Sequence, residues 1–315
     1  MSVGVNVAVS SERLGNGVWR LRFGTPEPFT PHALRARQPA WDRLAALPAA
    51  PEPPSCLRGI TCDIRPARTV VRVPCDEPED SIFGFGLDPG TLEQKGLRKW
   101  LSVSAQVVGK TGASHGPVPF YVSTRGYGVY VDTARVPFVH VARLAPAGGA
   151  TGRDQPREPA TAAAVPDAPP ATGLRQVVFD LPGNGTGVDV YVFGGPSLRE
   201  AVQRYNLFSG GGCLPPMWGL GHKYRTHSNA DAAEVRSLAQ SFRARGIPCD
   251  MFGLEPGWQT HAYSCSFVWS PERFPEPEVL VRELAADGFR VNLWEHAYIH
   301  RSSPLYDRLA GRCGD

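Results

Sequence analysis

Residues 213–300 decide the fold of this chain: they begin CLPPMWGLGHKYRTH (213–227), continue through IPCDMFGLEPGWQTHAYSCSFVWSPERFPEP (247–277) and end GFRVNLWEHAYIH (288–300). Short apolar runs alternate in this stretch with amphipathic helix patterns. Strands separated by helices pair in parallel, because a helical crossover returns the chain to the starting edge of the sheet and covers its face. The stretch therefore predicts strand, helix, strand, long loop, helix, strand, which is the opening of a barrel.

The first helix pattern covers residues 229–245. Ser228, followed by Asp231 three residues later, resembles a capping box at its start. Gly246 stands where a glycine commonly ends a helix. The apolar residues between them recur at i, i+3, i+4 and i+7, namely Val235, Leu238, Ala239 and Phe242. This spacing predicts an amphipathic helix.

The second helix pattern begins after Pro275 and Pro277 and stops at Gly288. Four of its residues are expected to face a core, namely Val279, Leu280, Leu284 and Ala285. An apolar run follows each helix, at 251–254 and at 289–294. These runs predict the second and third strands, and the first strand is expected to end before residues 222–225.

Polar and aromatic residues gather after each predicted strand: His222, Lys223, Tyr224 and Arg225 after the first, Glu255, Trp258 and Gln259 after the second, and Trp294, Glu295 and His296 after the third. In parallel α/β folds the carboxyl ends of the strands meet at one rim, where reactive groups collect. A pyranose offers hydroxyl groups to a carboxylate and an apolar C–H face to an indole. The pattern favours a sugar site. The alternative is that Trp258 and Trp294 are core residues and the charged residues are solvated loop residues.

Several motifs, in family order, resemble glycoside hydrolase family 31. They are FGFGLDPG (83–90), VPFYVSTRGYGVYVDT (118–133), GGPSLREAVQRYNLFSG (194–210), LPPMWGLG (214–221), FRARGIPCDMFGLE (242–255), WSPERFPEP (269–277) and GFRVNLWEHAYI (288–299). The resemblance implies an N-terminal antiparallel β-sandwich of the galactose-mutarotase type joined to a (β/α)8 TIM barrel. It also implies hydrolysis of terminal α-glycosidic bonds with retention, a carbohydrate substrate and no cofactor.

The N-terminal part consists of short β-branched and aromatic runs between Gly and Pro, which predict the antiparallel β-sandwich over residues 1–209. Within it, Asn16-Gly17 and Arg125-Gly126 are turn positions, and residues 32–55 are predicted to be an extended excursion. Residues 145–173 are predicted to be a disordered insertion, because with so few large apolar side chains they cannot offset their ordering entropy. Residues 210–315 then supply the first three of eight barrel strands, since a complete barrel takes about 250 residues.

The resemblance also assigns roles to the rim residues. The family's nucleophile lies on strand four and its acid/base on strand six, so no catalytic residue is predicted here and the chain is expected to be inactive, as the N-terminal portion of a longer enzyme. Glu255 takes the place of the first aspartate of a sugar-binding Asp-x-Asp pair, and Gly257 replaces the second. Trp294 matches the family's strand-three tryptophan.

The predicted substrate-binding residues are Glu255, Trp258, Trp294, Glu295 and His296. Glu295 and His296 depart from the family's common pattern of an apolar residue or aspartate followed by proline, and this resembles a branch that includes α-galactosidase-type enzymes. One alternative is that Glu255 and Glu295 are themselves the catalytic pair, because retaining enzymes place two carboxyl groups about 5 Å apart. Another is a catalytically inactive carbohydrate-binding or interaction protein.

Composition bears on the remaining classes of partner. With 42% hydrophobic and 20% charged residues, the sequence is that of an ordinary soluble globular protein, and a net charge of +3 without basic runs gives no basis for nucleic-acid binding. No run approaches the ~20 apolar residues of a membrane helix and the N-terminus lacks a secretory pattern, so a cytoplasmic protein is expected. The seven cysteines are predicted to be reduced thiols, mostly buried, and no zinc-like spacing predicts a metal site. The oligomeric state stays open.

Overall fold

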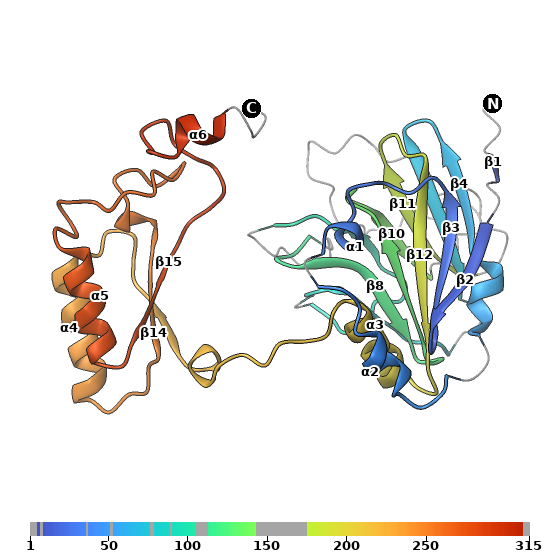
Figure 1. Cartoon of the computed structure of the whole chain (residues 1–315), viewed down its shortest axis with the longest axis horizontal. Helices are drawn as coiled ribbons and strands as arrows, with labels where there is room; N and C mark the ends of the chain where they lie inside the picture. The colour runs from blue at the N-terminus through green and yellow to red at the C-terminus, as the bar shows by residue number, and fades with distance from the viewer. Residues whose placement is uncertain are drawn as a thin grey trace. The chain divides into compact units, whose positions relative to one another are not determined.

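The computed structural model of the chain describes residues 5–6, 9–35, 37–50, 53–75, 79–88, 90–104, 113–142 and 175–310. The chain divides into two compact units, Met1–Gly212 and Cys213–Asp315 (Figure 1). The insertion predicted at 145–173 lies outside the described residues.

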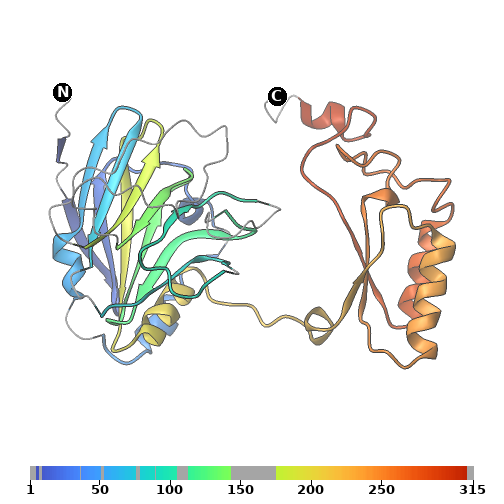
Figure 2. The ribbon, with the colours of Figure 1, turned by 180° about the vertical axis from the view of Figure 1, so that it is seen from behind.

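Unit 1 contains two six-stranded antiparallel sheets. The first has the strand order β1 (Val5–Asn6), β4 (Thr61–Arg65), β5 (Arg68–Pro74), β11 (Gln176–Pro182), β10 (Phe138–Val141) and β7 (Arg98–Trp100). The second has the order β2 (Val9–Gly15), β3 (Val18–Gly24), β12 (Gly187–Gly194), β9 (Tyr127–Asp132), β8 (Pro117–Ser123) and β6 (Ile82–Gly86). Figure 2 shows the same unit from behind, with its long strands side by side.

The side chains of β12 show how the core of unit 1 is divided. Val188, Val190 and Val192 belong to one apolar cluster, which also holds residues of the first sheet, so this face is the interior of a sandwich. Tyr191 and Phe193 point to the other face, where they pack with Leu207 and Phe208 of α3 (Leu198–Phe208). Every residue of β12 is buried because both faces of the strand are covered.

Both predicted turn positions join neighbouring strands. Asn16 and Gly17 connect β2 to β3, and Gly126 connects β8 to β9. Gly17 has φ +71° and Gly126 has φ +79°, a backbone region that glycine adopts without steric cost. The hairpin predictions are confirmed.

The excursion predicted at 32–55 is only partly extended, because it contains the short helices α1 (Pro31–Leu34) and α2 (Trp41–Ala45) and the start of η1 (Ser55–Gly59). Buried Asp132 anchors its beginning: the Thr30 hydroxyl donates to Oδ2 at 2.6 Å and the His32 backbone N–H donates to Oδ1 at 3.1 Å. The His32 ring stacks on Phe208 at 4.6 Å. Short helices therefore interrupt a segment that its proline residues predicted to be extended.

Acidification is expected to destabilise unit 1 through His32. Burial, with a smaller effect of the Arg35 charge, lowers the pKa of His32 from 6.5 to about 4. Between these pH values the unfolded chain binds a proton that the folded chain does not, so the stabilisation is complete above pH 6.5 and is lost as the pH falls to about 4. Urea unfolding measured across this range should show a shallower pH dependence in His32→Phe, which keeps a ring against Phe208. An unchanged slope in that variant would contradict the role of His32.

Unit 2 is a three-stranded parallel sheet in the order β13 (Lys223–Arg225), β14 (Met251–Leu254) and β15 (Arg290–Leu293). The helices α4 (Ala232–Ala244) and α5 (Pro277–Ala286) cover the same face of this sheet (Figure 1). The short elements η2 (Met217–Leu220), η3 (Pro256–Trp258) and α6 (Tyr306–Ala310) complete it. The alternation of strand and helix, with parallel pairing, is as predicted.

Three local predictions for unit 2 are corrected. The first strand consists of Lys223–Arg225 itself, whereas residues 222–225 were expected to follow it. Helix α4 begins later than expected, because the N-cap is Asp231, whose carboxylate accepts from the backbone N–H of Glu234 at 2.8 Å. On α5, Leu280 and Leu284 are buried as predicted, but Ala285 is exposed.

Two expectations from the composition, on the cysteines and on membrane helices, can be compared with the structure. The six cysteines among the described residues form no disulfide bond with one another, and five of them are buried, as predicted, whereas Cys213 is exposed. Over the same residues, none of the helices is both long and apolar enough to cross a membrane.

Candidate functional site

The two faces of the parallel sheet in unit 2 differ in chemistry. Tyr224, Phe252 and Val291 lie on the face covered by the helices and belong to the apolar core of the unit. The alternating positions are polar or aromatic and lie on the opposite face: Lys223 and Arg225 on β13, Gly253 and Glu255 on and after β14, and Asn292 and Trp294 on and after β15. Because side chains alternate along a strand, three adjacent parallel strands place these six residues on one face of the sheet, with Arg225, Gly253 and Asn292 in register.

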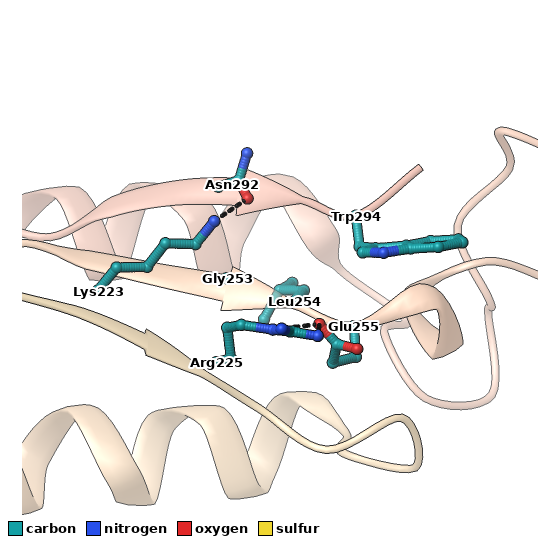
Figure 3. Close-up of a pocket in the computed structure, with 7 residues that line it drawn as sticks. All are labelled: Lys223, Arg225, Gly253, Leu254, Glu255, Asn292 and Trp294. Atoms are coloured by element: carbon teal, nitrogen blue, oxygen red, sulfur yellow. Dashed lines mark hydrogen bonds and ion pairs between the residues drawn. The ribbon is translucent and has the colours of Figure 1, made fainter. Parts of the chain in front are cut away.

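These residues line a hollow of about 190 Å³ (Figure 3). Its lining residues are Lys223, Arg225, Gly253, Leu254, Glu255, Asn292 and Trp294. In the picture the Trp294 ring lies beyond the end of β15 beside Glu255, and Lys223 lies farther back along the sheet. Two of the predicted site residues, Glu255 and Trp294, are thus brought together at one hollow.

Glu255 is held by Arg225. The Arg225 Nε and Nη2 atoms both contact Oε1 of Glu255, at 2.8 and 2.7 Å. The Glu255 side chain is 17% exposed and that of Arg225 is 64% exposed, so the carboxylate is the more enclosed partner. Since both contacts go to Oε1, Oε2 keeps its capacity to accept a hydrogen bond from a ligand hydroxyl.

A second polar pair lies farther back along the sheet. The Lys223 ammonium donates to the Asn292 Oδ1 atom, which joins β13 to β15 across β14 (Figure 3). The close approach is possible because the intervening residue, Gly253, has no side chain: a Cβ there would lie 2.6 Å from the Lys223 Cε atom. Asn292 was not among the predicted site residues, although its place two residues before Trp294 on an alternating strand is a signal that points to the same face.

Trp258 does not lie in the wall of the hollow, contrary to its predicted role in substrate binding. It is 4% exposed, packs against Trp269 at a centroid distance of 5.0 Å, and belongs to the core under the sheet. Its indole N–H donates to the backbone carbonyl of Trp294 at 2.8 Å. The short helix η3 turns Trp258 inward after Glu255, so Trp258 supports the ends of β14 and β15 from beneath.

Glu295 and His296 also lie outside the residues that line the hollow. Glu295 is exposed, because it follows Trp294 directly and neighbouring side chains of an extended segment point in opposite directions. His296 is half-buried, its backbone N–H meets the Cys265 sulfur at 3.4 Å, and its Nδ1 atom accepts from the backbone N–H of Tyr298 at 3.0 Å. Neither residue therefore lines the hollow together with Glu255.

Gly257 has no room for the side chain that an acid pair would need. A Cβ built on Gly257 would lie 1.6 Å from the carbonyl oxygen of Ser228, in the loop before α4. The space beside Glu255 that a second carboxylate would occupy is thus filled by backbone.

Substituting Gly257 by alanine is expected to destabilise unit 2 by roughly 1–3 kcal/mol, because the Ser228 backbone has to shift to accommodate the methyl group. Gly219→Ala is the matched control in the same unit, since its Cβ would meet nothing closer than 3.6 Å. Urea unfolding followed by circular dichroism measures both. Equal urea midpoints of unfolding for the two variants would show that the loop containing Ser228 relaxes without a cost in free energy.

The chemistry available at the hollow is that of binding. One carboxylate, two cationic side chains and one amide can hydrogen-bond to hydroxyl groups, and the Trp294 ring offers an apolar surface. Glu255 is the sole carboxylate among the lining residues that the structure describes. The described parts of the chain also contain no group of three or more His, Cys, Asp or Glu side chains placed to hold a metal ion.

Comparisons with known proteins show which families and proteins this chain is similar to. Residues 212–312 match the model of the glycosyl hydrolases family 31 TIM-barrel domain. Alpha-xylosidase XylQ of Lactiplantibacillus pentosus is 29% identical over 191 residues, which are 60% of this chain and 21% of that protein. Alpha-glucosidase 2 of Bacillus thermoamyloliquefaciens is 34% identical over 107 residues, which are 34% of this chain and 13% of that protein.

A solved structure has the same fold. The GH31 dextranase of Flavobacterium johnsoniae, complexed with isomaltotriose, superposes with a TM-score of 0.67 at 15% identity, over 98% of this chain and 40% of that one. The chain spans about a fifth or less of the length of the two curated relatives.

Proposed function

Because the chain belongs to glycosyl hydrolase family 31, we propose that its hollow holds the terminal sugar of an α-glycoside, in a retaining α-glycosidase. The observation that carries this proposal is the convergence of Glu255 and Trp294 on one hollow. A carboxylate and an indole are complementary to the hydroxyl groups and the C–H face of a pyranose.

In this proposal each lining residue has a binding task. Glu255 accepts a hydrogen bond from a sugar hydroxyl through Oε2, while Arg225 holds the carboxylate in place through Oε1. Trp294 covers the apolar face of the ring. Lys223 and Asn292, joined to each other, line the hollow on the side away from Trp294 and present a donor and an amide to the sugar.

Hydrolysis with retention requires a nucleophilic carboxylate and a carboxylic acid about 5 Å apart. Glu255 is engaged by Arg225, and Glu295 is not among the lining residues, so we assign neither of them to the reaction. We propose that the reacting carboxyl groups belong to other strands of an eight-stranded barrel that begins with β13, β14 and β15. We also propose that unit 1 is a sandwich of the galactose-mutarotase type.

A more specific part of the proposal is the identity of the sugar. The names of the two curated relatives support an α-xyloside or an α-glucoside. The combination of GLEPGWQ (253–259) with NLWEHA (292–297) supports an α-galactoside, because it resembles a branch of the family that includes α-galactosidase-type enzymes. A titration with all three sugars ranks these candidates.

The experiment titrates the 315-residue chain with the methyl α-glycosides of xylose, glucose and galactose by isothermal titration calorimetry. It also assays release of p-nitrophenol from the corresponding p-nitrophenyl α-glycosides. We expect saturable binding of at least one glycoside without turnover. Absence of binding by all three would overturn the sugar site, and turnover would overturn the assignment of the reacting carboxyl groups elsewhere.

A catalytically inactive carbohydrate-binding protein of the same parts would also pass the binding test. Sequencing the transcript beyond the codon for Asp315 distinguishes the two. A further strand that ends in an aspartate supports the glycosidase, whereas a stop codon without such a strand supports the binding protein.

A further inference from the structure

The lining of the hollow carries more positive than negative charge. It includes two cations, Lys223 and Arg225, and one carboxylate, Glu255. Arg225 contacts Glu255 through two nitrogen atoms, so these two charges compensate each other. Lys223 instead donates to the neutral amide oxygen of Asn292 (Figure 3), and no carboxylate among the residues that the structure describes forms an ion pair with it. Within the described part of unit 2, the Lys223 charge is thus uncompensated.

The Lys223 ammonium lies over the central strand of the sheet. A Cβ built on Gly253 would lie 2.6 Å from the Lys223 Cε atom and 3.4 Å from Nζ, so the side chain crosses β14 at this glycine. Gly253 is in register with Asn292, whose Oδ1 atom accepts from the ammonium. Glu255 follows Gly253 by two residues, which span about 7 Å along a strand. The ammonium therefore lies back along the sheet from Glu255 by a distance comparable to the length of one pyranose ring.

The ammonium keeps donors for a ligand. A lysine ammonium has three N–H donors and no acceptor, and the contact with Asn292 takes one of them. A ligand anion would accept from the others and gain a charge-assisted hydrogen bond. A ligand with hydroxyl groups alone would displace water from the ammonium without supplying the opposite charge. An anionic group on the ligand is thus the better electrostatic match for this side of the hollow.

We propose that the sugar held in the hollow is acidic and carries a carboxylate on C5, as in a uronic acid, which pairs with Lys223. The inference rests on the proposed function and deepens it, because it names the class of sugar. A terminal sugar turns its C1 oxygen toward the rim, where the rest of the substrate leaves, so its C5 substituent is free to face back along the sheet toward Lys223. A carboxylate adds less bulk at C5 than a sulfate or phosphate ester, which suits a hollow of about 190 Å³.

The test compares neutral and acidic sugars on the 315-residue chain. Calorimetric titrations pair methyl α-D-glucopyranoside with methyl α-D-glucuronide, and methyl α-D-galactopyranoside with methyl α-D-galacturonide, so that both C4 epimers are covered. In at least one pair we expect the wild type to bind the acidic sugar about three- to tenfold more tightly than the neutral one. This ratio should fall as salt is added, because salt screens exposed charges.

Two variants make the result specific. Lys223→Met keeps a long side chain but removes its charge, and should bring the ratio of the acidic to the neutral affinity to about one. Arg236→Gln is the matched control, because it removes one positive charge from α4, which covers the far face of the sheet. This control should keep the wild-type ratio. Circular dichroism checks that both variants stay folded.

The outcomes separate this inference from the proposed function. If the wild type binds a neutral glycoside but prefers neither acidic sugar, the acidic substrate is overturned and the hollow remains a sugar site. The inference is also overturned if Lys223→Met keeps the wild-type ratio, or if Arg236→Gln lowers the ratio as much as Lys223→Met does. Absence of binding by all four sugars would overturn the proposed function as well.

Discussion

Glu255→Gln is expected to weaken binding of the preferred methyl α-glycoside by about ten- to a hundredfold, because a hydrogen bond to a charged group contributes about 1.5–3 kcal/mol. The variant keeps the shape of the side chain but replaces a carboxylate that is 17% exposed and borders the hollow. Isothermal titration calorimetry with the methyl α-glycosides of xylose, glucose and galactose measures the loss.

The structure offers a matched control for this variant. Glu283 also forms an ion pair with an arginine, Arg236, at 2.6 Å, but on the helices that cover the far face of the sheet. Glu283→Gln should leave sugar affinity unchanged. Both variants should keep nearly the wild-type stability, because Arg225 and both partners of the second pair are solvent-exposed, and such pairs contribute about 0–1 kcal/mol. A similar affinity loss in both would mean that Glu255 does not act at the hollow.

Trp258→Ala is expected to lower the free energy of unfolding of unit 2 by about 3–5 kcal/mol, because it removes a large side chain from the core and leaves a cavity. The same change removes the hydrogen bond to the Trp294 carbonyl, so the end of β15 loses a support. Urea unfolding of the chain, followed by circular dichroism and tryptophan fluorescence, measures the change.

Trp258→Phe separates packing from the hydrogen bond. It keeps an aromatic ring against Trp269 and should cost less than alanine, because the cavity is smaller. If Trp258→Ala kept the wild-type stability but lost sugar binding, the buried position would be contradicted. Trp258 would then be assigned to the wall of the hollow.

The helices and central strand of unit 2 were predictable because their signals are local. The periodic apolar residues of α4, the glycine after it and the run Met251–Leu254 each act within a few neighbouring residues. Alternating strands and helices then imply parallel pairing, and parallel pairing brings the ends of β14 and β15 to one rim. Glu255 and Trp294 follow from that rule without knowledge of any contact.

The residues that sequence reasoning misplaced depend on contacts between segments far apart in the chain. The sequence pattern places Lys223 and Arg225 in a polar cluster after the first strand. They form β13 because its polar face borders the hollow, where Lys223 meets Asn292 and Arg225 meets Glu255. Asn292 was missed for the same reason, since its partner lies 69 residues earlier.

By itself the sequence determined the order of strands and helices, the parallel pairing in unit 2 and the two residues, Glu255 and Trp294, that meet at the rim. Only the tertiary structure decided which of two similar tryptophans faces the hollow. Trp258 and Trp294 both follow a strand end, but Trp258 turns into the core because its indole N–H and its ring find partners there, in Trp294 and Trp269. Periodicity and capping are properties of neighbouring residues, whereas the direction of a side chain at a strand end is settled by what packs beneath it.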